Sequence, residues 1–126
     1  MKRNLLYWLC GAMLAGVPLY AHHSFAVDYF ETQTVSVEGE LLQFQHKNPH
    51  SIVVIAVTDE RGQVQTYTGE WGGTNRLNRD GVTPQTLKPG DHIIVNGSPG
   101  RTPGERKLHL KGIFRPADGW RWGRAS

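Results

Sequence analysis

Two adjacent histidines, His22 and His23, lie where a hydrophobic N-terminal stretch gives way to polar sequence (AHHSF). If the chain is cut after Ala21, His22 gains a free α-amine beside its imidazole, and these two nitrogens can chelate one ion. His23 adds a second imidazole. Such a nitrogen set suits Cu(II), which favours square-planar coordination, and also Zn(II), which prefers four tetrahedral ligands. The pair predicts a copper site or, second, a zinc site; the alternative is an exposed, flexible leader.

Three further side chains are candidate ligands for the same ion. Pro49 fixes its own φ and pushes Asn48 toward an extended backbone, so the direction of His50 at the start of a strand is constrained. His46 lies four residues earlier and can approach the same point. Glu70 ends a later strand and is predicted as a ligand or as the acceptor that orients a ligand histidine. The alternatives are a rigid connection that His50 covers, with Asn48 bonded to local backbone, and a solvated Glu70.

The remaining candidates carry weaker signals. His92 and His109 are predicted to be surface residues, because one follows a turn and the other alternates with leucines. Scattered arginines are predicted to be solvated rather than to grip an anion; they are Arg76, Arg79, Arg101 and Arg106. The sequence has no glycine-rich phosphate loop, serine elbow or telling pair of carboxylates, so we predict a protein that is not an enzyme.

Residues 1–21 resemble a secretory signal peptide. Lys2 and Arg3 precede an apolar run that Pro18 ends, and the run is short for a bilayer span, which needs roughly 20 residues. A retained membrane anchor is the alternative. The only cysteine, Cys10, lies within this segment, so the processed chain has no disulfide and no thiolate ligand. We therefore predict a periplasmic protein that holds metal by nitrogen and oxygen.

The charge balance of the chain bears on whether it binds nucleic acid. The chain has 14 basic and 11 acidic residues, and two of the basic ones belong to residues 1–21. The processed chain is close to neutral, so its composition does not favour a nucleic-acid partner.

The elements that must position these residues predict an all-β fold. Alternating and β-branched runs predict strands over 34–44, 51–58, 63–70, 92–97 and 107–114, with a bulge in the first where its apolar phase slips. A short helix is expected within 72–81, capped by Thr74 and closed by Gly81. This order predicts a five-stranded OB-like barrel with a short helix between strands three and four. A β-sandwich is the alternative.

The predicted barrel spans residues 34–114 and leaves two flanking segments. Residues 22–33 form an N-terminal leader that carries the histidine pair. Residues 115–126 form a tail rich in Trp and Arg, predicted to be loosely held. The 126 residues leave room for one domain.

The chain also resembles an uncharacterised family of small secreted bacterial proteins, classed as a domain of unknown function. The segments that carry this resemblance are AHHSF at 21–25, Asn48-Pro49-His50, Glu70, 77–81 (LNRDG) and 87–91 (LKPGD). The resemblance implies a small periplasmic domain in which the two histidine motifs belong together. It implies no activity.

Three hypotheses for function follow. The leading one is a periplasmic metal-binding protein for copper carriage, sensing or delivery. The second is a non-catalytic envelope module that docks a periplasmic or membrane protein through the barrel face and the C-terminal tail. The third, a binder of oligosaccharide or nucleic acid, rests on fold analogy alone and ranks last.

Overall fold

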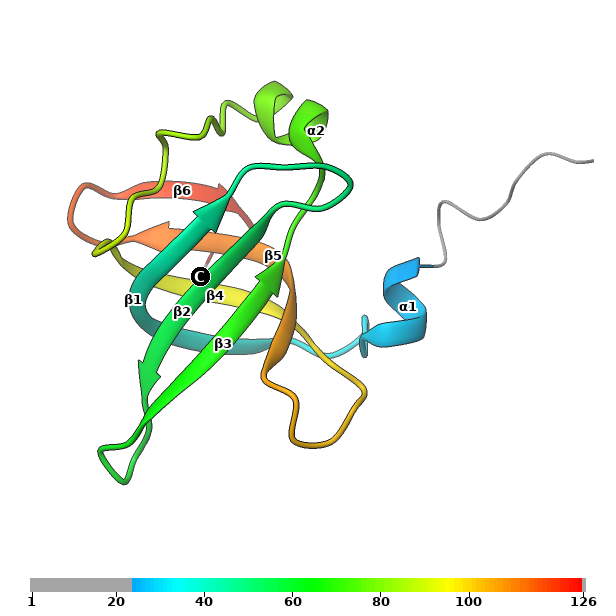
Figure 1. Cartoon of the computed structure of the whole chain (residues 1–126), viewed down its shortest axis with the longest axis vertical. Coiled ribbons are helices and arrows are strands. Elements are labelled where there is room, and N and C mark those ends of the chain that lie inside the picture. Colours follow the sequence, from blue (N-terminus) through cyan, green and yellow to red (C-terminus); the bar gives the residue numbers. More distant parts are fainter. Residues whose placement is uncertain (1–23, 126) are drawn as a thin grey trace, which may run out of the picture.

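The computed structural model describes residues 24–125. Its chain runs through two short helices and six strands (Figure 1). In order, these are α1 (Ser24–Asp28), β1 (Val35–Gln45), β2 (Ile52–Thr58), β3 (Val64–Glu70), α2 (Thr74–Arg79), β4 (His92–Pro99), β5 (Lys107–Arg115) and β6 (Trp120–Gly123).

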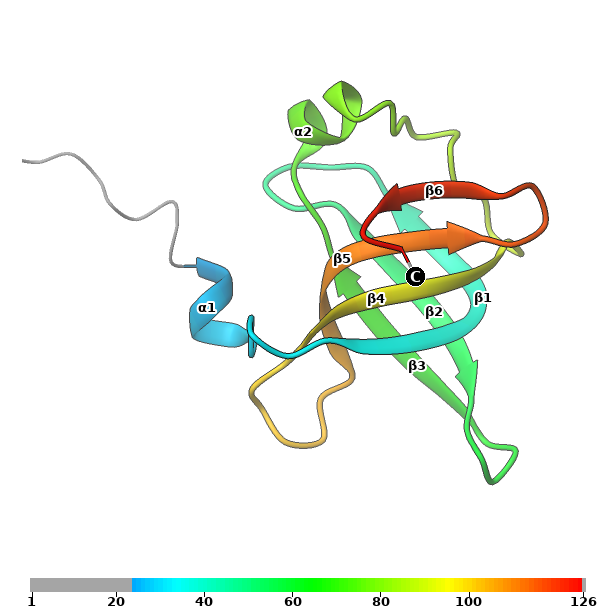
Figure 2. The same ribbon diagram turned by 180° about the vertical axis from the view of Figure 1, so that it is seen from behind.

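Five of the strands form a closed barrel. The sheet order is β3-β2-β1-β4-β5-β6, and a parallel pairing of β3 with β5 closes the ring. That pairing places Thr68, Gly69 and Glu70 opposite Lys107, Leu108 and His109. The OB-like barrel with a helix between β3 and β4 is thus confirmed. Seen from behind, α2 lies over one end of the barrel and β6 runs along its edge (Figure 2).

The β1 strand contains a bulge and pairs with both β2 and β4. The register with β2 shifts between Leu41 and Gln43. Leu41 is fully buried, Leu42 is 45% exposed, and Phe44 packs against the core again. The predicted phase slip is therefore real, and the extra residue is Leu42, which points outward instead of joining the apolar set.

The barrel interior is filled by aliphatic side chains from β1, β2, β4 and β5 and by residues of the β3–β4 connection, while β3 contributes Tyr67, which packs against this core. The buried cluster comprises Leu41, Val53, Ile55, Trp71, Leu77, Val82, Leu87, Ile93, Val95, Leu108, Leu110 and Ile113. Burial of this apolar surface is the main stabilising contribution available to a barrel whose described part contains no cysteine.

The α2 helix is held from outside rather than by its own first residue. Thr74 was predicted to cap it, but Gly73 occupies the N-cap position and makes no side-chain cap bond. Instead, the side-chain oxygen of Asn48 accepts a hydrogen bond of 2.9 Å from the Thr74 amide. Leu77 is buried, and Gly81 ends the helix at φ +78°, as predicted.

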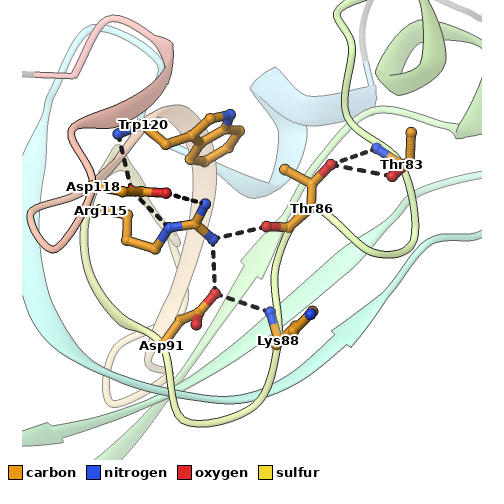
Figure 3. A network of polar contacts seen from close by, with 7 residues as sticks. All are labelled: Thr83, Thr86, Lys88, Asp91, Arg115, Asp118 and Trp120. Carbon is orange, nitrogen blue, oxygen red and sulfur yellow. Dashed lines mark hydrogen bonds and ion pairs between the residues drawn. The ribbon is translucent and has the colours of Figure 1, made fainter.

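The C-terminal segment is not loosely held, so that prediction was wrong for residues 115–125. The β6 strand pairs with β5, and Trp120 and Trp122 pack against the core. The Arg115 guanidinium anchors the turn between β5 and β6. It donates to Asp118, to Asp91 Oδ2 at 2.9 Å and to the Thr86 carbonyl at 2.8 Å (Figure 3). Composition shows that this segment is rich in Trp and Arg. It does not show that residues of the β3–β4 connection bond to Arg115.

Candidate functional site

Sheet register brings three chemically active side chains to one outer face of the barrel. Ile52 pairs with Glu70 across β2 and β3, and His50 lies two residues before Ile52, on the same side of the strand. Glu70 is in turn opposite His109 in the parallel pairing of β3 with β5. Their neighbours Val53 and Leu108 point into the core. His50, Glu70 and His109 therefore share a face on the outside of the barrel.

The α1 helix covers this face with an aromatic ring from the AHHSF segment. The ring of Phe25 stacks on that of His109, with centroids 3.7 Å apart and planes within 5°. Its centroid is also 4.8 Å from that of His50. Tyr29, one helical turn later, contacts both Phe25 and His109. The N-terminal motif and the Asn48-Pro49-His50 motif thus meet through Phe25.

Two basic side chains fasten the leader to the barrel. Arg101 Nε donates to the carbonyls of Ala26 and Tyr29 at the end of α1. The Lys111 ammonium makes three contacts with the following turn, to the carbonyls of Glu31 and Gln33 and to the hydroxyl of Thr34. Arg101, predicted to be solvated, is therefore structural. The leader from residue 24 onward is docked, not free.

Tyr29 is a buried phenol beside a carboxylate. Its side chain is 1% exposed, and its hydroxyl lies next to Glu70 outside the geometry of a good hydrogen bond. Burial, and after it the Glu70 carboxylate, raise the pKa of the Tyr29 hydroxyl above its ordinary value. Tyr29 consequently stays neutral and can only act toward Glu70 as a hydrogen-bond donor.

Both outer-face histidines meet a carboxylate through the same ring nitrogen. His109 Nδ1 lies 2.8 Å from Glu31 Oε1, and His50 Nδ1 lies 3.5 Å from Glu70 Oε2, the latter an ion-pair distance. A neutral imidazole that donates from Nδ1 presents an unprotonated Nε2, which is the arrangement of metal-binding histidines and their outer carboxylates. Among residues 24–125, however, no three such side chains gather at a point that could hold a metal ion.

The predicted ligands have different positions. His22 and His23 lie outside the described residues. His50 and Glu70 lie close together, with His50 36% and Glu70 25% exposed. His46 faces elsewhere: its Nε2 donates to the Val82 carbonyl at 3.2 Å.

The two histidines assigned to the surface differ from each other. His92 is 57% exposed and pairs with Glu38, as a surface residue should. His109 is on the outer face, as its alternation with leucines indicated, but only 21% exposed because α1 covers it. The sequence held one signal for this cover: Phe25 and Tyr29 are four residues apart, the spacing that places two rings on one side of a helical turn.

Asn48 fixes where His50 begins its strand. Its bond to Thr74 spans 26 residues, and the Asn48-Pro49 peptide is cis. The next residues extend the β2–β3 ladder, since Ser51 exchanges backbone hydrogen bonds with Trp71 and Gly72. Asn48 therefore bonds a distant helix rather than the local backbone. Hydrogen bonds of Asn48 and Ser51 hold the connection that carries His50 at both of its ends.

The chain is thus a small β-barrel protein whose N-terminal helix is docked over a pair of histidine–carboxylate contacts. It belongs to the family of unknown function DUF6152, whose family model matches residues 11–108. The resemblance seen in the sequence is confirmed at the level of the family. No curated protein matches the chain. None of the helices in residues 24–125 has the length and apolar character needed to cross a membrane.

Proposed function

We propose that the processed protein binds one copper ion through the α-amine and imidazole of His22 together with His23 and His50. Zinc is the second candidate. The Glu70 carboxylate orients His50 through the Nδ1 atom of the histidine, and Glu70 is also a candidate ligand. His46 is a further candidate ligand that lies apart from these two. The protein is exported to the periplasm, and the ion is carried, sensed or delivered rather than used for catalysis.

The contact between Phe25 and His50 carries this proposal. Consecutive Cα atoms are about 3.8 Å apart, so the Cα of His23 is within about 7.6 Å of that of Phe25 in any conformation. The Phe25 ring centroid is 4.8 Å from that of His50. Chain connectivity therefore keeps the histidine pair in the neighbourhood of His50, a relation that sequence spacing alone does not require.

The choice of metal follows from the donor types. The proposed set consists of nitrogen atoms, and the processed chain has no cysteine to supply a soft thiolate. Imidazole and amine nitrogens in a planar set favour Cu(II), which also leads the divalent ions in general affinity. Zn(II) would require the four ligands in a tetrahedral rather than a planar arrangement, and Glu70, whose Oε2 lies 3.5 Å from His50 Nδ1, is available to replace one of the nitrogen donors.

Variants of His50 and of its neighbour Glu70 test the role of His50 in copper binding. We expect His50→Ala to weaken Cu(II) binding at least tenfold and to change the nitrogen hyperfine pattern in the electron paramagnetic resonance spectrum, because one imidazole ligand is lost. Glu70→Gln should weaken binding roughly tenfold, which is the lower end of the usual effect of such outer carboxylates.

His92→Ala is the control for this experiment. His92 also contacts a glutamate through a ring nitrogen, at 2.7 Å from Glu38, but lies on another part of the barrel. It should leave affinity and spectrum unchanged. Equal losses for His50→Ala and His92→Ala, or no loss for either, would contradict a specific site at His50.

A further inference from the structure

A pocket of about 320 Å³ is lined in part by His109, at the point where β5 ceases to pair with β3. Its apolar wall is formed by Trp71, Leu110 and Trp122, and its charged rim by Arg76 and Arg124. Small-molecule sites in proteins typically have this size and combine an apolar lining with a few polar groups. Since Arg76 of α2 and Trp122 of β6 both line it, the pocket exists only because the C-terminal segment folds onto the barrel.

Within residues 24–125, the two arginines at the rim have no acidic partner. Neither the Arg76 nor the Arg124 guanidinium makes a hydrogen bond or ion pair within residues 24–125, and the described lining includes no acidic side chain. The third basic residue there, Lys111, is already engaged with the leader. Gly72 leaves room for Arg76, because a Cβ at Gly72 would lie 2.9 Å from Arg76 Cδ. The rim thus offers two uncommitted guanidinium groups.

The apolar wall adds a buried donor without a partner. Trp71 is 1% exposed, and its indole N–H has no hydrogen-bond partner in the described chain. The Trp122 ring meets it edge-on, with centroids 4.7 Å apart, and Trp122 gives its own N–H to Asp80. Buried indole N–H groups usually have an acceptor. The indole rings of Trp71 and Trp122 would suit a flat apolar group.

We propose that this pocket binds a small organic anion in which a carboxylate is attached to a planar apolar group. Guanidinium groups recognise carboxylates by paired, charge-assisted hydrogen bonds, and indole rings provide the surface for a flat body. The site does not include His22, His23 or His50, so it is independent of the metal proposal.

Benzoate is the probe for this site, and its neutral isostere benzamide is the matched control ligand. In ¹H–¹⁵N spectra of the metal-free processed protein, benzoate should cause saturable shifts of the Trp71 and Trp122 indole N–H signals. Benzamide should bind at least about tenfold more weakly, because it lacks the charge. Inorganic phosphate should cause smaller shifts at Trp71, because it lacks the planar body.

Arginine variants locate the binding. Arg76→Gln and Arg124→Gln should each weaken benzoate binding about tenfold. Arg79→Gln, an exposed residue of the same helix outside the lining, should bind as the unaltered protein does. The remaining amide signals report whether each variant is folded. No saturable shift by millimolar benzoate, equal binding of benzamide, or an equal loss in Arg79→Gln would overturn the proposal.

Discussion

A protein with four extra residues ahead of His22 is expected to bind Cu(II) about 100-fold more weakly than one that begins at His22. In the proposed site the α-amine and imidazole of one residue grip the same ion, and joining two binding groups in this way strengthens binding by roughly 10²- to 10⁴-fold. The extension moves the α-amine away while keeping every histidine. Competition titration against a chromophoric copper chelator measures the difference.

The length of the extension matters. A single added residue would make His23 the third residue, so that amine, backbone amides and imidazole could form a different copper site. Four residues such as Gly-Ser-Gly-Ser avoid this. The same extension on the His22→Ala/His23→Ala double variant is the control and should change affinity little, because no imidazole remains beside the α-amine to form a chelate. Unchanged affinity in the extended protein would remove the α-amine from the site.

Replacing Arg115 with Met should lower the free energy of unfolding by roughly 2 to 3 kcal/mol. The Arg115 side chain is 17% exposed and joins β5 to Asp91 and Asp118 by charged hydrogen bonds (Figure 3). Methionine keeps the length of the side chain but leaves those carboxylates without their cation. Urea unfolding followed by tryptophan fluorescence measures the loss, because Trp120 and Trp122 lie on the strand that Arg115 anchors.

Arg121→Met is the control for Arg115. Both side chains lie over an aromatic ring, Arg115 at 5.4 Å from the centroid of Trp120 and Arg121 at 4.5 Å from that of Phe114, but Arg121 contacts no carboxylate within the described residues. It should cost less than about 1 kcal/mol. Equal losses in both variants would show that stacking, not the carboxylate network, holds β6.

The same network predicts a pH dependence. Hydrogen bonding from Arg115 holds the pKa of Asp118 below its ordinary value. A carboxyl with a lowered folded pKa stabilises the fold above its ordinary pKa, near 4, and loses that contribution as pH falls through the folded pKa. The stability gap between the unaltered protein and Arg115→Met should therefore be constant near neutral pH and narrow below about pH 4.

Local patterns were enough to predict the barrel. Strand runs, the phase slip at Leu42 and the glycine that ends α2 each depend on neighbours in the chain, and all three lie where the patterns indicated. Thr74 failed as a cap because Asn48 accepts its amide hydrogen bond across 26 residues. Tertiary partners of this kind leave no trace in local spacing.

The site was predictable only in part, for the same reason. Pro49 indicated that His50 is held in place, and Glu70 was placed at a strand end, so their meeting follows from register. The covering of His109 by α1 does not follow from register, because it depends on how the leader crosses a barrel face. Arg115 and Trp122 were likewise misjudged, since an Arg- and Trp-rich terminus has the composition of a solvated tail.

The most direct test of the central claim is one measurement on protein isolated from the periplasm: intact mass under native conditions, with metal content from the same sample. A chain that begins at His22 and carries one copper ion is the predicted result. A chain that begins elsewhere, or one that begins at His22 but holds no metal and takes up no Cu(II) when it is offered, would contradict the account.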